Sequence, residues 1–373
     1  AAADGHTSVG LSGSATLGYN NDDVFGEDGF YWDTQLKIAM SAALDNGITA
    51  SATFGIEIDD EGSDSDLATT GFFDNNDFGL LSNSLLLSLT TETLGLHFGD
   101  TSFAAESQWK SAGDMEADAF SEADGEVVLR ADAMYSGVSA SVSYAIANVD
   151  GGYVADDGAT GSAGDQLSLG ASGAFGMVNF AVAYQAEADN VGYFGSNGDF
   201  TDQEVIGVSA GTTVAGADIT VAYAQWTDIA PSDEVLTSMG IQVAYPIGPV
   251  TATVYYVAED AEVAGDVDDN YGITVAYADG PFAATLDYDN DQGTNKWNLD
   301  GSYDTGLGLT VLAGMQNENE GDDADYYVGG DYDLGGGANV LVVYANDEDG
   351  DQEDEIGAGE YMPGTTIAVS FSF

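Results

Sequence analysis

The last residues of the chain alternate strictly between large apolar and small side chains. From Ile367 to Phe373 every second residue is Ile, Val or Phe, and the residues between them are Ala or Ser. A period of two over this length predicts a β-strand with one apolar face and one face that tolerates polar groups. The chain is therefore expected to end in the strand of a sheet.

The same alternation recurs along the chain, each time after a short cluster of turn residues. These apolar stretches end in tyrosine, at Tyr184, Tyr223, Tyr256, Tyr288 and Tyr344. Each stretch then runs into acidic residues, which are Glu259 and Asp260 in one case and Asp289 in another. The repeat predicts hairpins that each have a short turn at one end and a long acidic loop at the other.

Short turn signals along the chain indicate the number of strands. They lie at residues 45–47, 93–95, 136–137, 174–177, 214–217, 247–249, 279–281, 304–306 and 335–337. Together with the terminal strands they predict about 20 strands, or about 16 to 18 if one or two hairpins lie outside a membrane. Short turns at one end and long loops at the other are typical of outer-membrane barrels. We therefore expect an all-β, transmembrane, antiparallel β-barrel with an even number of strands, formed by residues 1–373 as one domain.

Aromatic residues bracket the aliphatic stretches and support a membrane barrel. The five tyrosines above lie at the loop end of their strands, and a second row near the turns comprises Tyr135, Phe175, Tyr245, Phe282, Tyr303, Tyr332, Phe371 and Phe373. Two such rows fit aromatic girdles at two membrane–water interfaces. The alternative is a large soluble β-sandwich, in which tyrosine is simply common in strands.

Composition narrows the possible partners. The 65 acidic residues outnumber four basic ones, and the formal net charge of −61 excludes nucleic acid, whose phosphates would be repelled. The chain is 44% hydrophobic and has 20 Tyr and 16 Phe, which is too apolar for a disordered protein.

The chain has no Cys, so disulfides and thiolate metal sites are excluded. No basic or apolar leader precedes Ala1, so we expect a mature form whose export signal has been cleaved.

Few residues suggest chemistry. The two histidines are His6 and His97, and nothing in the sequence pairs His97 with a particular Ser, so we interpret it as a wall residue and expect no enzyme. No cofactor is required. Asp347, Asp349 and Asp351 have the opening spacing of a calcium-binding loop, but Gln352 and Ala358 break the EF-hand pattern. Weak calcium binding and a solvated acidic surface suited to saline water both remain open.

The four basic residues mark the expected lumen. Strand alternation places Lys37 with Asp33, Arg130 with Asp132, and Lys296 on the face opposite the apolar stripe. The fourth, Lys110, lies in the long irregular segment Thr101–Glu126. The acidic residues of this segment are Glu106, Asp114, Glu116, Asp118, Glu122 and Asp124.

Four motifs, in this order along the chain, resemble the trimeric general porins of the alphaproteobacterial type. They are Gly10-Leu11-Ser12-Gly13, Phe98-Gly99-Asp100-Thr101, Asp331-Tyr332-Asp333-Leu334-Gly335-Gly336-Gly337 and the terminal Phe373. The resemblance implies that Thr101–Glu126 is a loop folded into the barrel, with its acids facing Lys37, Arg130 and Lys296 across the pore. The chain departs from the family in its few wall bases and in its strand count, which exceeds the family's roughly 16.

These observations predict an outer-membrane porin. It would form a water-filled, cation-selective channel for passive diffusion of small hydrophilic solutes and ions, as a homotrimer in contact with outer-membrane lipid and lipopolysaccharide of a Gram-negative bacterium. Two alternatives are a substrate-specific channel, for which Tyr31, Tyr255 and Trp109 are the lumen aromatics, and a secreted acidic calcium-binding β-protein.

Overall fold

The fold was obtained as a computed structural model. It describes residues 7–21, 29–44, 46–59, 85–122, 126–148, 166–187, 201, 203–227, 234–262, 267–317, 324–346, 361 and 363–373. Within this part of the chain, no helix is long and apolar enough to cross a membrane.

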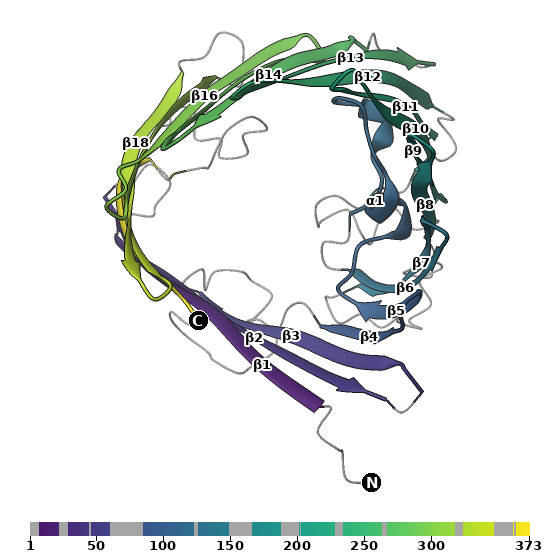
Figure 1. Cartoon of the computed structure of the whole chain (residues 1–373), viewed down its shortest axis with the longest axis horizontal. Helices are drawn as coiled ribbons and strands as arrows, with labels where there is room; N and C mark the ends of the chain where they lie inside the picture. Colours follow the sequence, from purple (N-terminus) through teal and green to yellow (C-terminus); the bar gives the residue numbers. More distant parts are fainter. Residues whose placement is uncertain are drawn as a thin grey trace.

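Twenty strands form one closed antiparallel sheet (Figure 1). In chain order they are β1 (Thr7–Asn20), β2 (Gly29–Ala43), β3 (Thr49–Asp59), β4 (Leu86–Thr90), β5 (Leu94–Gly99), β6 (Glu126–Tyr135), β7 (Val138–Asn148), β8 (Leu167–Phe175), β9 (Val178–Gln185), β10 (Glu204–Val214), β11 (Ala217–Thr227), β12 (Val235–Ile247), β13 (Val250–Ala261), β14 (Asn270–Asp279), β15 (Phe282–Asp291), β16 (Thr294–Asp304), β17 (Leu309–Asn317), β18 (Asp325–Gly335), β19 (Ala338–Asn346) and β20 (Gly364–Ser372).

The terminal strands close the barrel. β20 pairs with β19 on one side and with β1 on the other, and Leu17 lies opposite Val369. The expected barrel is confirmed, with 20 strands. The count exceeds the roughly 16 expected from the resemblance, so this barrel is larger.

Side chains alternate between the outer and inner faces as the period of two predicts. On β11, Val221 is 46% exposed whereas its neighbour Ala222 is 5% exposed. The aliphatic side chains of the other strands are likewise exposed on the outer face, where lipid rather than water is their natural solvent. Small and polar side chains therefore face inward, and the wide interior does not have to be filled by the strands themselves.

The short turns lie where the sequence predicts them, and their backbone explains the glycines. Ser136–Gly137 and Ala215–Gly216 both have positive φ at the two central positions, as a two-residue hairpin turn of the I′ type requires. Gly adopts this conformation at almost no steric cost.

One prediction about the loops is wrong. β15 and β16 are joined at the long-loop end by only Gln292 and Gly293, whose φ values of 46° and 83° form another tight turn. Asp289 lies inside β15 rather than in a loop, and Glu259 and Asp260 likewise lie inside β13. Asp289 and Glu259 lie on the inner face, where an acidic residue can line a water-filled interior without ending the strand.

Candidate functional site

A segment between β5 and β6 enters the barrel. Residues Thr101–Glu122, named here the inward segment, contain the one-turn helix α1 (Ala104–Gln108) and the short 3-10 helix η2 (Glu116–Asp118). α1 packs against β7, β8 and β9, and η2 packs against β10, β11 and β12. Figure 1 shows α1 inside the ring of strands. The segment thus lies along the inner face of one part of the wall. β6 begins at Glu126, and Asp124 lies outside the described residues.

Neutral side chains of the wall hold the backbone of the inward segment. The hydrogen bonds run from Ala104 N to Ser143 Oγ at 2.8 Å, from Ala105 N to Ser168 Oγ at 2.7 Å, from Ala117 N to Ser238 Oγ at 2.8 Å and from Ser121 N to Gln185 Oε1 at 2.6 Å. All of these acceptors are buried. A buried N–H without a partner is costly, so these four bonds fix the path of the segment along the wall.

A chain of contacts ties the start of the segment to the wall. Arg130 donates from Nη1 to the carbonyl oxygen of Ser102 at 2.9 Å, and its Nε lies 3.2 Å from Asp132 Oδ1. Asp132 also lies 3.1 Å from His97 Nε2, and His97 Nδ1 lies 2.8 Å from Ser88 Oγ. The sequence did not reveal the Ser88–His97 contact, although the β4–β5 turn places the two residues directly opposite each other.

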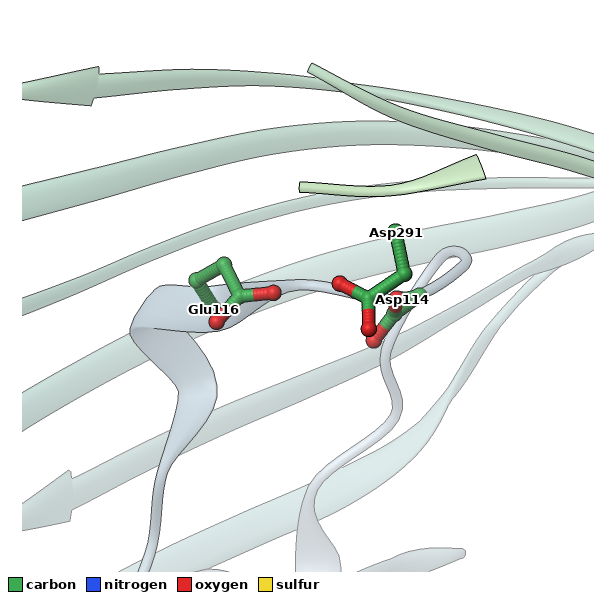
Figure 2. A group of neighbouring side chains, drawn as sticks. All are labelled: Asp114, Glu116 and Asp291. Atoms are coloured by element: carbon green, nitrogen blue, oxygen red, sulfur yellow. The ribbon is translucent and has the colours of Figure 1, made fainter. Parts of the chain in front are cut away.

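The tip of the segment meets the β15–β16 hairpin. Asp114, Glu116 and Asp291, named here the tip cluster, lie together although they come from two distant parts of the chain (Figure 2). Asn270 connects them, because its Nδ2 donates to Glu116 Oε1 at 2.9 Å and to Asp114 Oδ2 at 3.2 Å. Lys296 Nζ lies 2.7 Å from Asp291 Oδ2. The tip cluster and Lys296 line an open cavity of about 470 Å³.

The tip cluster has the donor set of a hard-cation site. One carboxylate oxygen from each of the three residues lies within 4.8 Å of the others. A Ca²⁺ ion binds oxygen at about 2.3–2.6 Å, so a single ion could contact all three carboxylates. The three residues singled out earlier for calcium, Asp347, Asp349 and Asp351, lie outside the described residues.

Asp118 lies beside the tip cluster and has an altered acidity. Trp109 Nε1 donates to its Oδ2 at 2.8 Å, and burial raises the pKa of this carboxyl to about 6, against the lowering effect of that hydrogen bond. Asp118 also lines the tip cavity. It is therefore charged at neutral pH and becomes neutral in mildly acidic solution.

This raised pKa predicts a pH-dependent current. As the pH falls through about 6, Asp118 takes up a proton and the lumen loses one negative charge, so the cation preference that the sequence predicts should fall between about pH 7 and about pH 5. Reversal potentials measured across this range would check it. Asp118→Asn keeps the acceptor for Trp109 and should remove the step near pH 6. An identical step in this variant would assign the titration to another group.

The other residues singled out from the sequence are dispersed. Asp33 and Lys37 lie at inward positions of β2, which pairs with β1 and β3, away from the strands that contact the inward segment. Lys110 and Glu122 are exposed on the segment, and Glu106 is partly buried in α1. Arg130 and Lys296 each contact an acid of their own wall, Asp132 and Asp291. The bases therefore do not form one row facing the acids across the pore.

The tyrosines at the ends of the strands lie on the outer face. They are Tyr184, Tyr223, Tyr256, Tyr288 and Tyr344, and Phe371 of β20 is exposed. The terminal Phe373 follows β20 and is 73% exposed. Several hydroxyls donate to a neighbouring polar side chain, as Tyr184 does to Glu204 Oε2 at 2.9 Å. An aromatic ring with a satisfied polar tip suits the membrane–water interface.

Two inward-facing aromatic residues, Tyr327 and Tyr361, were not predicted from the sequence. Tyr327 donates to Asp300 Oδ1, and its ring centroid lies 4.8 Å from that of Tyr361. Tyr327 alternates with the outward Tyr326, so its orientation could have been read from the parity of β18. Tyr361 comes from the connection before β20, and no strand pattern identifies it.

Comparisons with known proteins found similarity to porins. A family model described as Gram-negative porin matches residues 1–352 of the chain. Among solved structures, an engineered variant of the Rhodopseudomonas blastica porin aligns over 98% of this chain and 100% of its own, at 16% identity and a TM-score of 0.46. A second engineered variant of that porin covers the same shares at 16% identity, with a TM-score of 0.45. A search of curated proteins found no match.

Proposed function

Because the chain belongs to the Gram-negative porin family, whose members are channels of the outer membrane, we propose that it forms a water-filled, cation-selective pore for passive diffusion of small hydrophilic solutes. The observation that carries the selectivity is the excess of carboxylates inside the barrel. The tip cluster supplies three acids against one neighbouring base, Lys296. Fixed negative charge within a low-dielectric wall concentrates cations and repels anions.

The proposal is tested by the reversal potential of the purified protein in a planar bilayer under a salt gradient. We expect the reversal potential to have the sign of a cation-selective pore. Its magnitude should be smaller at high ionic strength, where salt screens the fixed charges more strongly. A potential of the opposite sign would reject cation selectivity and leave the porin assignment in place.

Lys37 should oppose cation flow, since its exposed side chain lies at an inward position of β2. Lys37→Glu should raise the cation-to-anion permeability ratio, because two units of negative charge are added to the lumen wall. Lys37→Gln changes the charge by only one unit, so it should give half of the change in the permeability ratio. The same measurement checks both variants, and equal ratios in all three proteins would place Lys37 away from the ion path.

Arg130→Glu is expected to do more than change the charge. The new carboxylate would stand beside Asp132, and the hydrogen bond to the Ser102 carbonyl oxygen would be lost. Raised cation selectivity should therefore be accompanied by a looser start of the inward segment.

A substrate-specific channel is the second candidate, favoured by the contact between the inward rings of Tyr327 and Tyr361. The inward Tyr255 and Trp109, by contrast, are occupied in packing, since they lie against Gly113 and Gly207. Rings used in this way are not free to form a continuous path for sugars. Saturable block of the current by one sugar would favour the specific channel. The porin family and the exposed aliphatic band favour a channel over the secreted calcium-binding alternative.

The assembly state is part of the proposal. We expect a homotrimer embedded in outer-membrane lipid and lipopolysaccharide, which chemical cross-linking of the reconstituted protein would test. Calcium is not required for the pore, and weak binding by acidic groups is expected to appear as reduced monovalent current when Ca²⁺ is added.

A further inference from the structure

The wall beneath the inward segment is built from the smallest side chains. Gly170 on β8, Gly207 on β10 and Gly240 on β12 all face inward, and alanines face inward on the strands between them. Strand pairing places them in a row: Gly170 lies opposite Ala183, Ala183 opposite Gly207, Gly207 opposite Ala224, and Ala222 opposite Gly240. These six residues are named here the seat.

The inward segment leaves no room above the glycines of the seat. A Cβ on Gly170 would collide with the carbonyl oxygen of Ala104 and come within 2.7 Å of Gln108 Cβ. A Cβ on Gly240 would collide with the carbonyl oxygen of Ala112. Both colliding oxygens belong to the backbone, so no side-chain rotation relieves the overlap. Glycine inside a strand weakens the strand and is typical of places where another backbone approaches closely.

We propose that the seat sets how far the inward segment projects into the lumen, so that the open cross-section of the pore is determined by wall residues as well as by the segment. This inference rests on the proposed channel function. The wall hydroxyls of Ser143, Ser168 and Ser238 hold the backbone of the segment against the seat. A methyl group added to the seat must therefore push the segment toward the axis of the barrel.

The test compares Gly170→Ala and Gly240→Ala with a matched control. Gly211→Ala lies on β10 at an inward position, four residues from Gly207, and its Cβ would make ordinary contacts at 3.4 Å from Thr220 Oγ1 and 3.5 Å from the Ile219 carbonyl oxygen. Single-channel conductance in a planar bilayer should fall in both seat variants, fall further in the double variant, and stay at the wild-type value in the control. Unchanged or increased conductance in the seat variants would overturn the proposal.

A second measurement separates the seat from the channel. Hydrogen exchange of the detergent-solubilised protein reports the amides of Ala104 and Ala105, which donate to Ser143 and Ser168. These amides should exchange faster in Gly170→Ala than in Gly211→Ala, whether or not the protein conducts. A wild-type protein without conductance would reject the channel alone, and equal exchange in the two variants would reject the seat.

Discussion

Replacing both Asp114 and Glu116 by lysine is expected to lower the cation-to-anion permeability ratio by at least about tenfold, a change equivalent to about 1.4 kcal/mol. The tip cluster and Lys296 comprise three acids and one base, and the double replacement changes their total by four units of charge. At about 4 Å, a single unit charge contributes roughly 1 kcal/mol even at the dielectric constant of water. Four units near the ion path therefore exceed the threshold despite screening by salt.

Matched variants separate local from overall charge. Glu204→Lys with Asp279→Lys alters the net charge by the same amount, but both residues lie at exposed outward positions near opposite ends of the wall. This pair should leave the reversal potential near the wild-type value. Asp114→Asn with Glu116→Gln keeps acceptors for Asn270 and should give an intermediate ratio. If the outer pair changed selectivity as much as the tip pair, the tip cluster would have no special role.

Val221→Arg is expected to destabilise the folded barrel by about 2–4 kcal/mol, the cost of an arginine facing lipid near the bilayer midplane. Val221 lies near the middle of β11 on the outer face. Thr220→Arg, one residue away, places the same side chain on the inner face, where water can solvate it, and should cost far less. The free energies of unfolding in lipid vesicles, measured by urea titration, give the comparison. Similar losses for both variants would contradict the assigned faces of β11.

The fold could be read from the sequence because its determinants are local. The period of two and the turn residues act within a hairpin, and each hairpin repeats the same pattern, so the count of 20 strands required no knowledge of distant contacts. The wrong prediction that Asp289 lies in a loop also came from local signals alone. An acidic residue inside a strand is unexpected only if both faces are assumed to be dry or buried.

The candidate site was less accessible to sequence reasoning because its contacts depend on distant segments. The acids of the inward segment were identified, but Asn270 and Gln292, which connect them to the β15–β16 hairpin, gave no signal of their own. Their role depends on where the tip of the segment comes to rest after the whole barrel has closed. The seat was missed for a similar reason, since glycine is common throughout the chain and only the register of β8 to β12 aligns these residues.

The short Gln292–Gly293 turn places the tip cluster off-centre along the pore. Asp291 is the last residue of β15, and Lys296 is the third residue of β16, so both lie near the loop end of the wall. Fixed charge near one mouth makes the two directions of ion flow unequal, because cations entering from that side are concentrated before the passage and those entering from the other side are not. If the pore conducts cations as proposed, its current is expected to be larger in one direction, and the polarity of the larger current would identify which mouth faces each side of a bilayer.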